Sequence, residues 1–92
     1  MIHDKELAMI NAATIALEYK IKHPRCWDDD AVAHVLKTLD SEAKLKIYGV
    51  AAANEILKLK KNNSQLTDKQ LLQSFTDNIF EVVSKIDGRM KN

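Results

Sequence analysis

Apolar side chains recur every three or four residues along four segments of the chain, which is the spacing of one face of an α-helix. These segments cover residues 4–22, 29–39, 41–61 and 67–90. His23-Pro24 ends the first segment, because the residue before a proline avoids the α region. The pattern predicts an all-α fold for residues 1–92: a single domain that forms a compact four-helix bundle, with three long helices and one short helix. No internal repeat is evident in the pattern.

Two helix starts carry recognisable signals. We expect Asp28 to cap the short helix, with Trp27 packed on Val32 as a hydrophobic staple. Thr67 and Gln70 have the spacing of a capping box, in which each side chain bonds the backbone of the other residue. The sequence therefore predicts that the last helix begins at about residue 67.

The first helix has two adjoining apolar stripes. One consists of larger aliphatic residues, and the other of three alanines followed by a tyrosine: Leu7, Ile10, Leu17 and Ile21, and then Ala8, Ala12, Ala16 and Tyr19. The uncharged stretch 47–54 of the third helix is also rich in small residues. Small side chains let two helix backbones come close, and this would offset the roughly 1 kcal/mol that a glycine inside a helix costs. We therefore predict a helix–helix interface at Ala12, Ala16, Gly49, Ala52 and Ala53.

This predicted interface has two interpretations. The small residues can bring the first and third helices together within one chain, or they can form a two-fold contact between chains. Because one of the four helices is short and the apolar stripes are wide, we expect the chain to self-associate as a homodimer.

Composition narrows the classes of function. The chain has 14 basic and 13 acidic residues and a net charge of +1, whereas proteins that depend on nucleic acid usually carry a basic excess. The single Cys26 excludes an intramolecular disulfide and suits a reducing compartment. No apolar stretch is long enough to span a membrane, and the N-terminus lacks the pattern of a signal peptide. We expect a cytoplasmic protein without a membrane partner.

The reactive side chains form no specific motif. His23, Cys26 and His34 are potential zinc ligands, but a second pair of ligands at a metal-site spacing is missing, so no metal or cofactor is expected. The segment from Ala33 to Lys37 resembles the phosphate-accepting segment of histidine phosphotransfer domains. This resemblance would make His34 a phosphocarrier, although Thr38 stands where that family has a glycine.

These observations predict a small non-enzymatic protein that acts through protein–protein interaction, with a regulatory role and a tendency to self-associate. One alternative is a nucleic-acid-associated regulator that uses the lysines of the third helix. Those lysines are Lys44, Lys46, Lys58, Lys60 and Lys61. The other alternative is the phosphocarrier centred on His34.

Overall fold

The chain folds into helices alone within the part that the computed structural model describes, residues 4–39 and 43–90. The helices are α1 (Asp4–Lys22), α2 (Asp28–Thr38), α3 (Ala43–Asn62), α4 (Asp68–Asp77) and α5 (Ile79–Met90). The predicted all-α class is confirmed. The predicted bounds of the first helix match α1, and those of the second differ from α2 by one residue at each end. The predicted start of the third helix at residue 41 lies outside the described residues.

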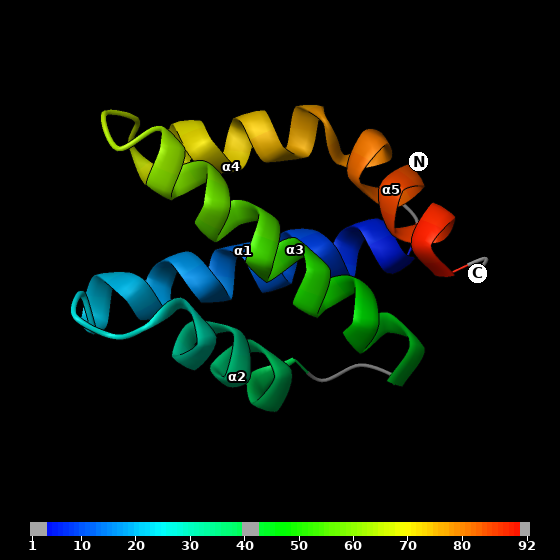
Figure 1. The fold of residues 1–92 in the computed structure, drawn as a ribbon, viewed down its shortest axis with the longest axis horizontal. Coiled ribbons are helices and arrows are strands. Elements are labelled where there is room, and N and C mark those ends of the chain that lie inside the picture. Colours follow the sequence, from blue (N-terminus) through cyan, green and yellow to red (C-terminus); the bar gives the residue numbers. More distant parts are fainter. Residues whose placement is uncertain (1–3, 40–42, 91–92) are drawn as a thin grey trace.

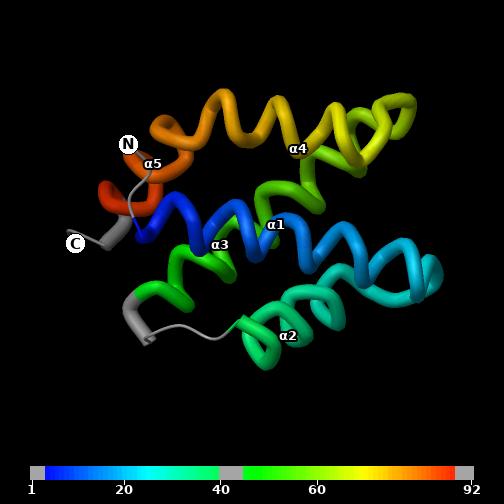
Figure 2. Tube along the Cα trace, turned by 180° about the vertical axis from the view of Figure 1, so that it is seen from behind, coloured from blue at the N-terminus to red at the C-terminus, as the bar shows by residue number. Residues whose placement is uncertain are grey.

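The two longest helices form the centre of the molecule. α1 and α3 cross in the middle and pack against each other more extensively than any other pair of described helices, with α2 on one side and α4 on the other (Figure 1). Both run towards the same end, so the α1–α2 and α3–α4 loops both lie at that end of the molecule, as the view from behind also shows (Figure 2). α5 lies at the opposite end and contacts α1, α3 and α4.

The predicted continuous helix over residues 67–90 is wrong, because it breaks at Asn78 into α4 and α5. The Asn78 amide Nδ2 donates to the Ser74 carbonyl at 2.9 Å, and Asn78 leaves the helical region with φ −107° and ψ 15°. The Asn78 backbone N–H also reaches the Ser74 carbonyl, at 3.2 Å, so side chain and backbone share this acceptor at the end of α4. Five helices are therefore described rather than the four that were predicted.

The start of α2 also differs from the prediction. Trp27, not Asp28, occupies the N-cap position, and Asp28 is the first helical residue. The Trp27 backbone N–H donates to Asp30 Oδ2 at 3.1 Å, which is half of a capping box. The other half is absent, because an indole has no oxygen that could accept from the helix backbone. The α4 start is complete, as predicted for Thr67 and Gln70.

The structure contains an internal repeat that the sequence pattern did not reveal. The hairpin α1–α2 and the hairpin α3–α4 bury equivalent positions, whose residue numbers differ by 40 throughout. Few of the equivalent residues are identical, so the relation rests on burial rather than identity. The buried pairs are Met9/Gly49, Ala12/Ala52, Ala13/Ala53, Ala16/Ile56, Leu17/Leu57, Ala31/Leu71, Val35/Phe75 and Leu39/Ile79.

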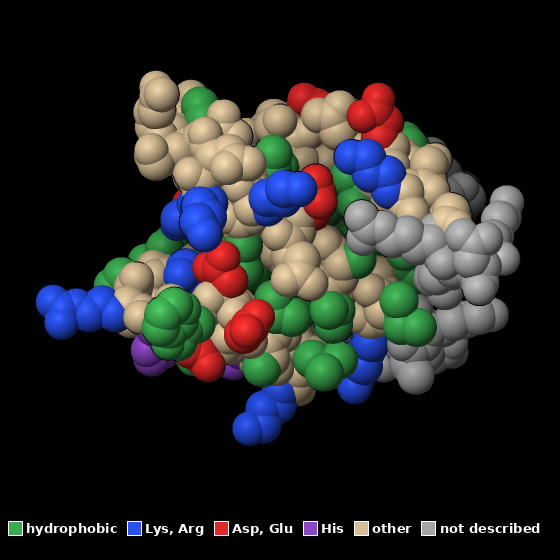
Figure 3. Space-filling view, in the orientation of Figure 1, with side chains coloured by type: hydrophobic (Ala, Val, Ile, Leu, Met, Phe, Trp, Pro, Cys, Tyr) green, Lys and Arg blue, Asp and Glu red, His purple; other side chains and the backbone are tan. Residues whose placement is uncertain are grey.

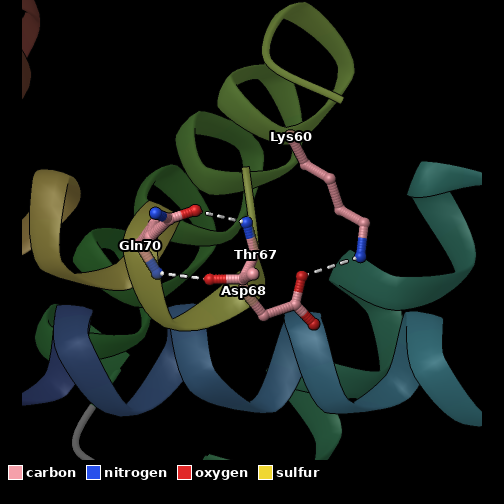
Figure 4. Close-up of polar contacts among 4 residues, drawn as sticks. All are labelled: Lys60, Thr67, Asp68 and Gln70. Atoms are coloured by element: carbon pink, nitrogen blue, oxygen red, sulfur yellow. Dashed lines mark hydrogen bonds and ion pairs between the residues drawn. The ribbon is translucent and has the colours of Figure 1, made fainter. Parts of the chain in front are cut away.

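The two hairpin loops repeat the same backbone bonds. The amide that follows the first helix donates to the carbonyl four residues earlier, at 2.8 Å for His23 and 2.9 Å for Asn63. An ion pair then joins the end of each first helix to the start of the second: Lys20 Nζ lies 3.3 Å from Asp28, and Lys60 Nζ lies 3.0 Å from Asp68 (Figure 4). These equivalent bonds show that the two hairpins have the same loop structure.

Candidate interaction surface

The small residues predicted to form a helix–helix interface lie in the core of one chain. Four of them are completely buried, and the fifth, Gly49, is buried as well: Ala12, Ala16, Ala52 and Ala53. A Cβ added to Gly49 would overlap Cδ2 of Leu39 and lie 3.4 Å from Cβ of Ala12. These residues therefore let α1, α3 and the end of α2 approach one another, and a contact between chains must use another surface.

The outward side of α2 carries apolar residues that the core does not cover. Ala31 and Val35 are buried, and Ala33, about 200° around the helix from each, points away from the core. The exposed residues around Ala33 include Leu36, whose exposed fraction is 46%. At the equivalent positions on α4 the outward residues are Gln73 and Thr76. α2 and α4 thus bury equivalent positions, but they carry different residues on their outward sides.

The seam between α2 and α3 has a hollow at each end. Near the C-terminal end of α2, Leu36, Lys46, Ile47 and Val50 line a hollow of about 360 Å³. Near the loops, Trp27, Asp28, Asp29 and five other residues line a hollow of about 500 Å³: Lys20, Cys26, Leu57, Lys60 and Lys61.

We call the surface made by Trp27, Ala33, Leu36, Ile47 and Val50 the α2 face. Figure 3 shows hydrophobic side chains gathered over α2 and the first turns of α3, in the orientation of Figure 1. The exposed fraction of Ile47 reaches 50%. Large apolar side chains that gather on one surface commonly mark a site where another molecule binds.

Trp27 is the most exposed large hydrophobic residue described, with 80% of its surface accessible. It does not form the predicted staple with Val32, because a packed indole would be covered. The N-cap position favours Ser, Thr, Asp or Asn, and the equivalent residue of the second hairpin is Thr67. Trp27 therefore serves the fold less well than a threonine would, and violations of this kind are expected at functional positions.

Charge is distributed unevenly along α2. Asp28, Asp29 and Asp30 occupy its first turn, and Lys37 lies in its last turn. Lys46 continues the basic end across the seam onto α3. Figure 3 shows acidic side chains beside the start of α2 and basic ones towards its far end. α2 itself is thus acidic in its first turn and basic in its last, and Lys20, Lys60 and Lys61 line the hollow beside the acidic turn.

A separate polar cluster attaches α5 to the central helices. Tyr48 Oη donates to Asp87 Oδ1 at 2.5 Å, and Lys5 Nζ lies 3.5 Å from Asp87 Oδ2 and 5.6 Å from the centre of the Tyr48 ring. The hydrogen bond to Asp87, then burial and the charges of Asp87 and Glu6, raise the pKa of Tyr48. Glu6 is buried, and its Oε2 has no hydrogen-bond partner among the described atoms. The cluster therefore joins α1, α3 and α5 through Lys5, Tyr48 and Asp87.

His23 and His34 lie against the same ring, that of Tyr19, and line one hollow of about 300 Å³ beside it. The Tyr19 ring stacks on His34, with ring centres 4.6 Å apart, and its centre also lies 4.6 Å from that of His23. His34 Nε2 is 3.3 Å from Thr38 Oγ1, so the half-buried imidazole already has contacts on a face and at a nitrogen. Across residues 4–39 and 43–90, no group of three or more His, Cys, Asp or Glu side chains is placed to hold a metal ion.

The lysines proposed for nucleic-acid binding lie at two ends of α3. Lys46 is near its start, whereas Lys58, Lys60 and Lys61 are in its last turns, about 20 Å away along the helix axis. The side chain of Lys44 is outside the described part of the chain. Lys60 is paired with Asp68. The described lysines therefore do not form one continuous basic patch.

Comparisons with known protein families, with curated proteins and with solved structures give no match for this chain. Among the described helices, none has the length and hydrophobicity that crossing a membrane requires.

Proposed function

We propose that the chain is a small non-enzymatic interaction protein that works as a homodimer and uses the α2 face to bind its second copy. The observation that carries this proposal is the contrast between α2 and α4. Both helices pack on α1 and α3 through equivalent buried residues, but α2 presents Trp27, Ala33 and Leu36 where α4 presents Thr67, Gln73 and Thr76. The requirements of the fold do not account for this difference.

The exposed residues of the α2 face suit a protein partner. Tryptophan is enriched among the residues that dominate binding energy, and it is most effective when neighbouring contacts exclude water from it. Trp27 lies beside a hollow, and Leu36 and Ile47 would supply apolar contacts farther along the seam. The regulatory role that we expect for the protein would then depend on the equilibrium between monomer and dimer.

The fluorescence of Trp27 tests this proposal, because Trp27 is the single tryptophan of the chain. Emission should move to shorter wavelength as protein concentration rises, since dimer formation removes the indole from water. Leu36→Thr, which introduces the residue found at the equivalent position of α4, should abolish the shift. Ile21→Thr is the matched control, because Ile21 is 63% exposed but lies outside the α2 face. Constant emission of the unmodified protein, or a shift that survives Leu36→Thr, would contradict the proposal.

One observation favours the nucleic-acid alternative as a second candidate. The hollow near the loops combines Trp27 with Lys60 and Lys61, and an exposed aromatic ring beside lysines suits single-stranded nucleic acid. Quenching of Trp27 by an oligonucleotide should then weaken steeply between low and moderate salt, because phosphate contacts release counterions. Absence of quenching at low salt would eliminate this candidate.

A further inference from the structure

We propose that two copies of the chain pair through antiparallel α2 helices, with a two-fold axis at Ala33 and reciprocal ion pairs between Asp29 of each copy and Lys37 of the other. This inference rests on the homodimer of the preceding section and specifies its geometry. It follows from the order of charges and small residues along the outward side of α2.

The register follows from the helix geometry. Asp29, Ala33 and Lys37 are spaced by four residues, all three are exposed, and they lie along one side of α2. In an antiparallel pair with Ala33 opposite Ala33, residue 29 of one helix lies opposite residue 37 of the other. Alanine at the two-fold axis lets the two helix backbones approach closely, whereas Gln73, its equivalent on α4, would hold them apart.

Charge makes this surface complementary to itself. Asp29 and Lys37 are about 12 Å apart along one helix, too far to pair within the chain. Neither has a hydrogen bond or ion pair with another residue in the described part of the chain. A two-fold contact uses the same patch twice, so each Asp29–Lys37 pair is formed two times. The antiparallel arrangement also places the acidic first turn of one helix beside the basic last turn of the other, which is favourable for both helix dipoles.

The same register accounts for Trp27. Residue 27 of one helix would lie opposite the end of α2 in the partner, where the hollow lined by Leu36, Lys46 and Ile47 opens. The indole would cover this apolar hollow, and Lys46 would lie against the ring face. The pairing therefore covers the exposed residues at both ends of the α2 face.

Charge reversal gives a direct test, read as the dimer dissociation constant by sedimentation velocity. Asp29→Lys and Lys37→Asp should each weaken self-association about tenfold, because each dimer would contain two like-charge contacts. The double variant should recover the original affinity. The matched controls are Lys69→Asp and Asp77→Lys at the equivalent positions of α4, and they should leave the affinity unchanged.

A mixture of the two single variants is the decisive arm. In a heterodimer, the lysine introduced at position 29 of one chain lies opposite the aspartate introduced at position 37 of the other. The unchanged Lys37 of the first chain lies opposite the unchanged Asp29 of the second, so both pairs are attractive. Native mass spectrometry should show the heterodimer in large excess over either homodimer. Because neither chain changes in the mixture, a folding defect of the single variants cannot produce this result.

The outcomes separate the two proposals. If the unmodified protein dimerises and Leu36→Thr dissociates it, but the mixture shows no preference for the heterodimer, the antiparallel register is overturned and the homodimer stands. If the unmodified protein is monomeric at every concentration, the homodimer and its geometry both fail.

Discussion

The two hairpins of this protein differ most where they face away from each other. Inside, they share the loop bonds, the lysine–aspartate ion pair and the buried positions, from Met9/Gly49 to Leu39/Ile79. Outside, α4 presents Gln73 and Thr76 where α2 presents Ala33 and Leu36 between its charged ends. The shared part shows what the fold requires. The difference therefore indicates that the outward residues of α2 serve binding rather than folding.

The largest effect should come from the equivalent buried positions Val35 and Phe75, which are both fully covered. Phe75→Ala should lower the free energy of unfolding by about 3–5 kcal/mol, because it leaves a large cavity. Val35→Ala removes two carbons and should cost about 2 kcal/mol. Urea denaturation of both variants measures the difference. Equal losses would mean that the two helices do not contribute to the core in proportion to the buried volume.

The next prediction concerns the crossing of α1 and α3. Ala52→Leu should cost about 1–3 kcal/mol, since the added carbons have no room at a close helix contact. Ala12→Leu, at the equivalent position of the first hairpin, should cost a similar amount. Thermal unfolding followed by circular dichroism compares them. If either variant kept full stability, the crossing would be looser than the burial of these alanines indicates.

The two hairpins differ at the buried position where the first has Met9 and the second has Gly49. Gly49→Ala should lower stability by about 1 kcal/mol, because the overlap with Leu39 outweighs the helix propensity gained. Gly88→Ala is the control: nothing lies within 4 Å of the added carbon, so the same change should raise stability by up to about 1 kcal/mol. The two changes in midpoint of urea unfolding should have opposite signs.

The smallest effects concern the two N-caps. Thr67→Ala should cost about 1 kcal/mol, because it removes the acceptor of the Gln70 N–H. Trp27→Thr should gain up to about 1 kcal/mol by completing the capping box, and it should weaken dimer formation. A more stable but more weakly associating Trp27→Thr would separate folding from binding at one residue. Loss of stability in this variant would show that Trp27 supports the fold.

The sequence predicted the parts of the fold that depend on local signals. Residues 4–22 and the capping box at Thr67 follow from periodicity and capping, which are properties of neighbouring residues. The break at Asn78 escaped prediction because Phe75, Ile79 and Val82 keep their apolar spacing across it. The repeat escaped because equivalent positions hold different residues, such as Ala16 and Ile56, that fill equivalent places in the core.

The prediction of buried faces succeeded for small residues and failed for some larger ones. The alanine stripe of α1 is buried, whereas Leu7 and Ile21 of the adjoining stripe are half exposed or more. Periodicity locates an apolar face but not which of two adjoining stripes meets another helix. The interface residues Ala12 and Ala52 were therefore predicted as a contact, but the choice between one chain and two needed the fold. The exposure of Trp27 was missed, although a tryptophan at an N-cap is a signal that the sequence contains.

The central claim, that the outward side of α2 is the binding surface, is tested most directly by the mass of the protein in solution. Light scattering over a concentration series should give twice the chain mass of 10.4 kDa for the unmodified protein. The double variant Ala33→Gln, Leu36→Thr, which gives α2 the outward residues of α4, should give the mass of one chain. A monomer in both cases, or a dimer that survives the exchange, would contradict the account.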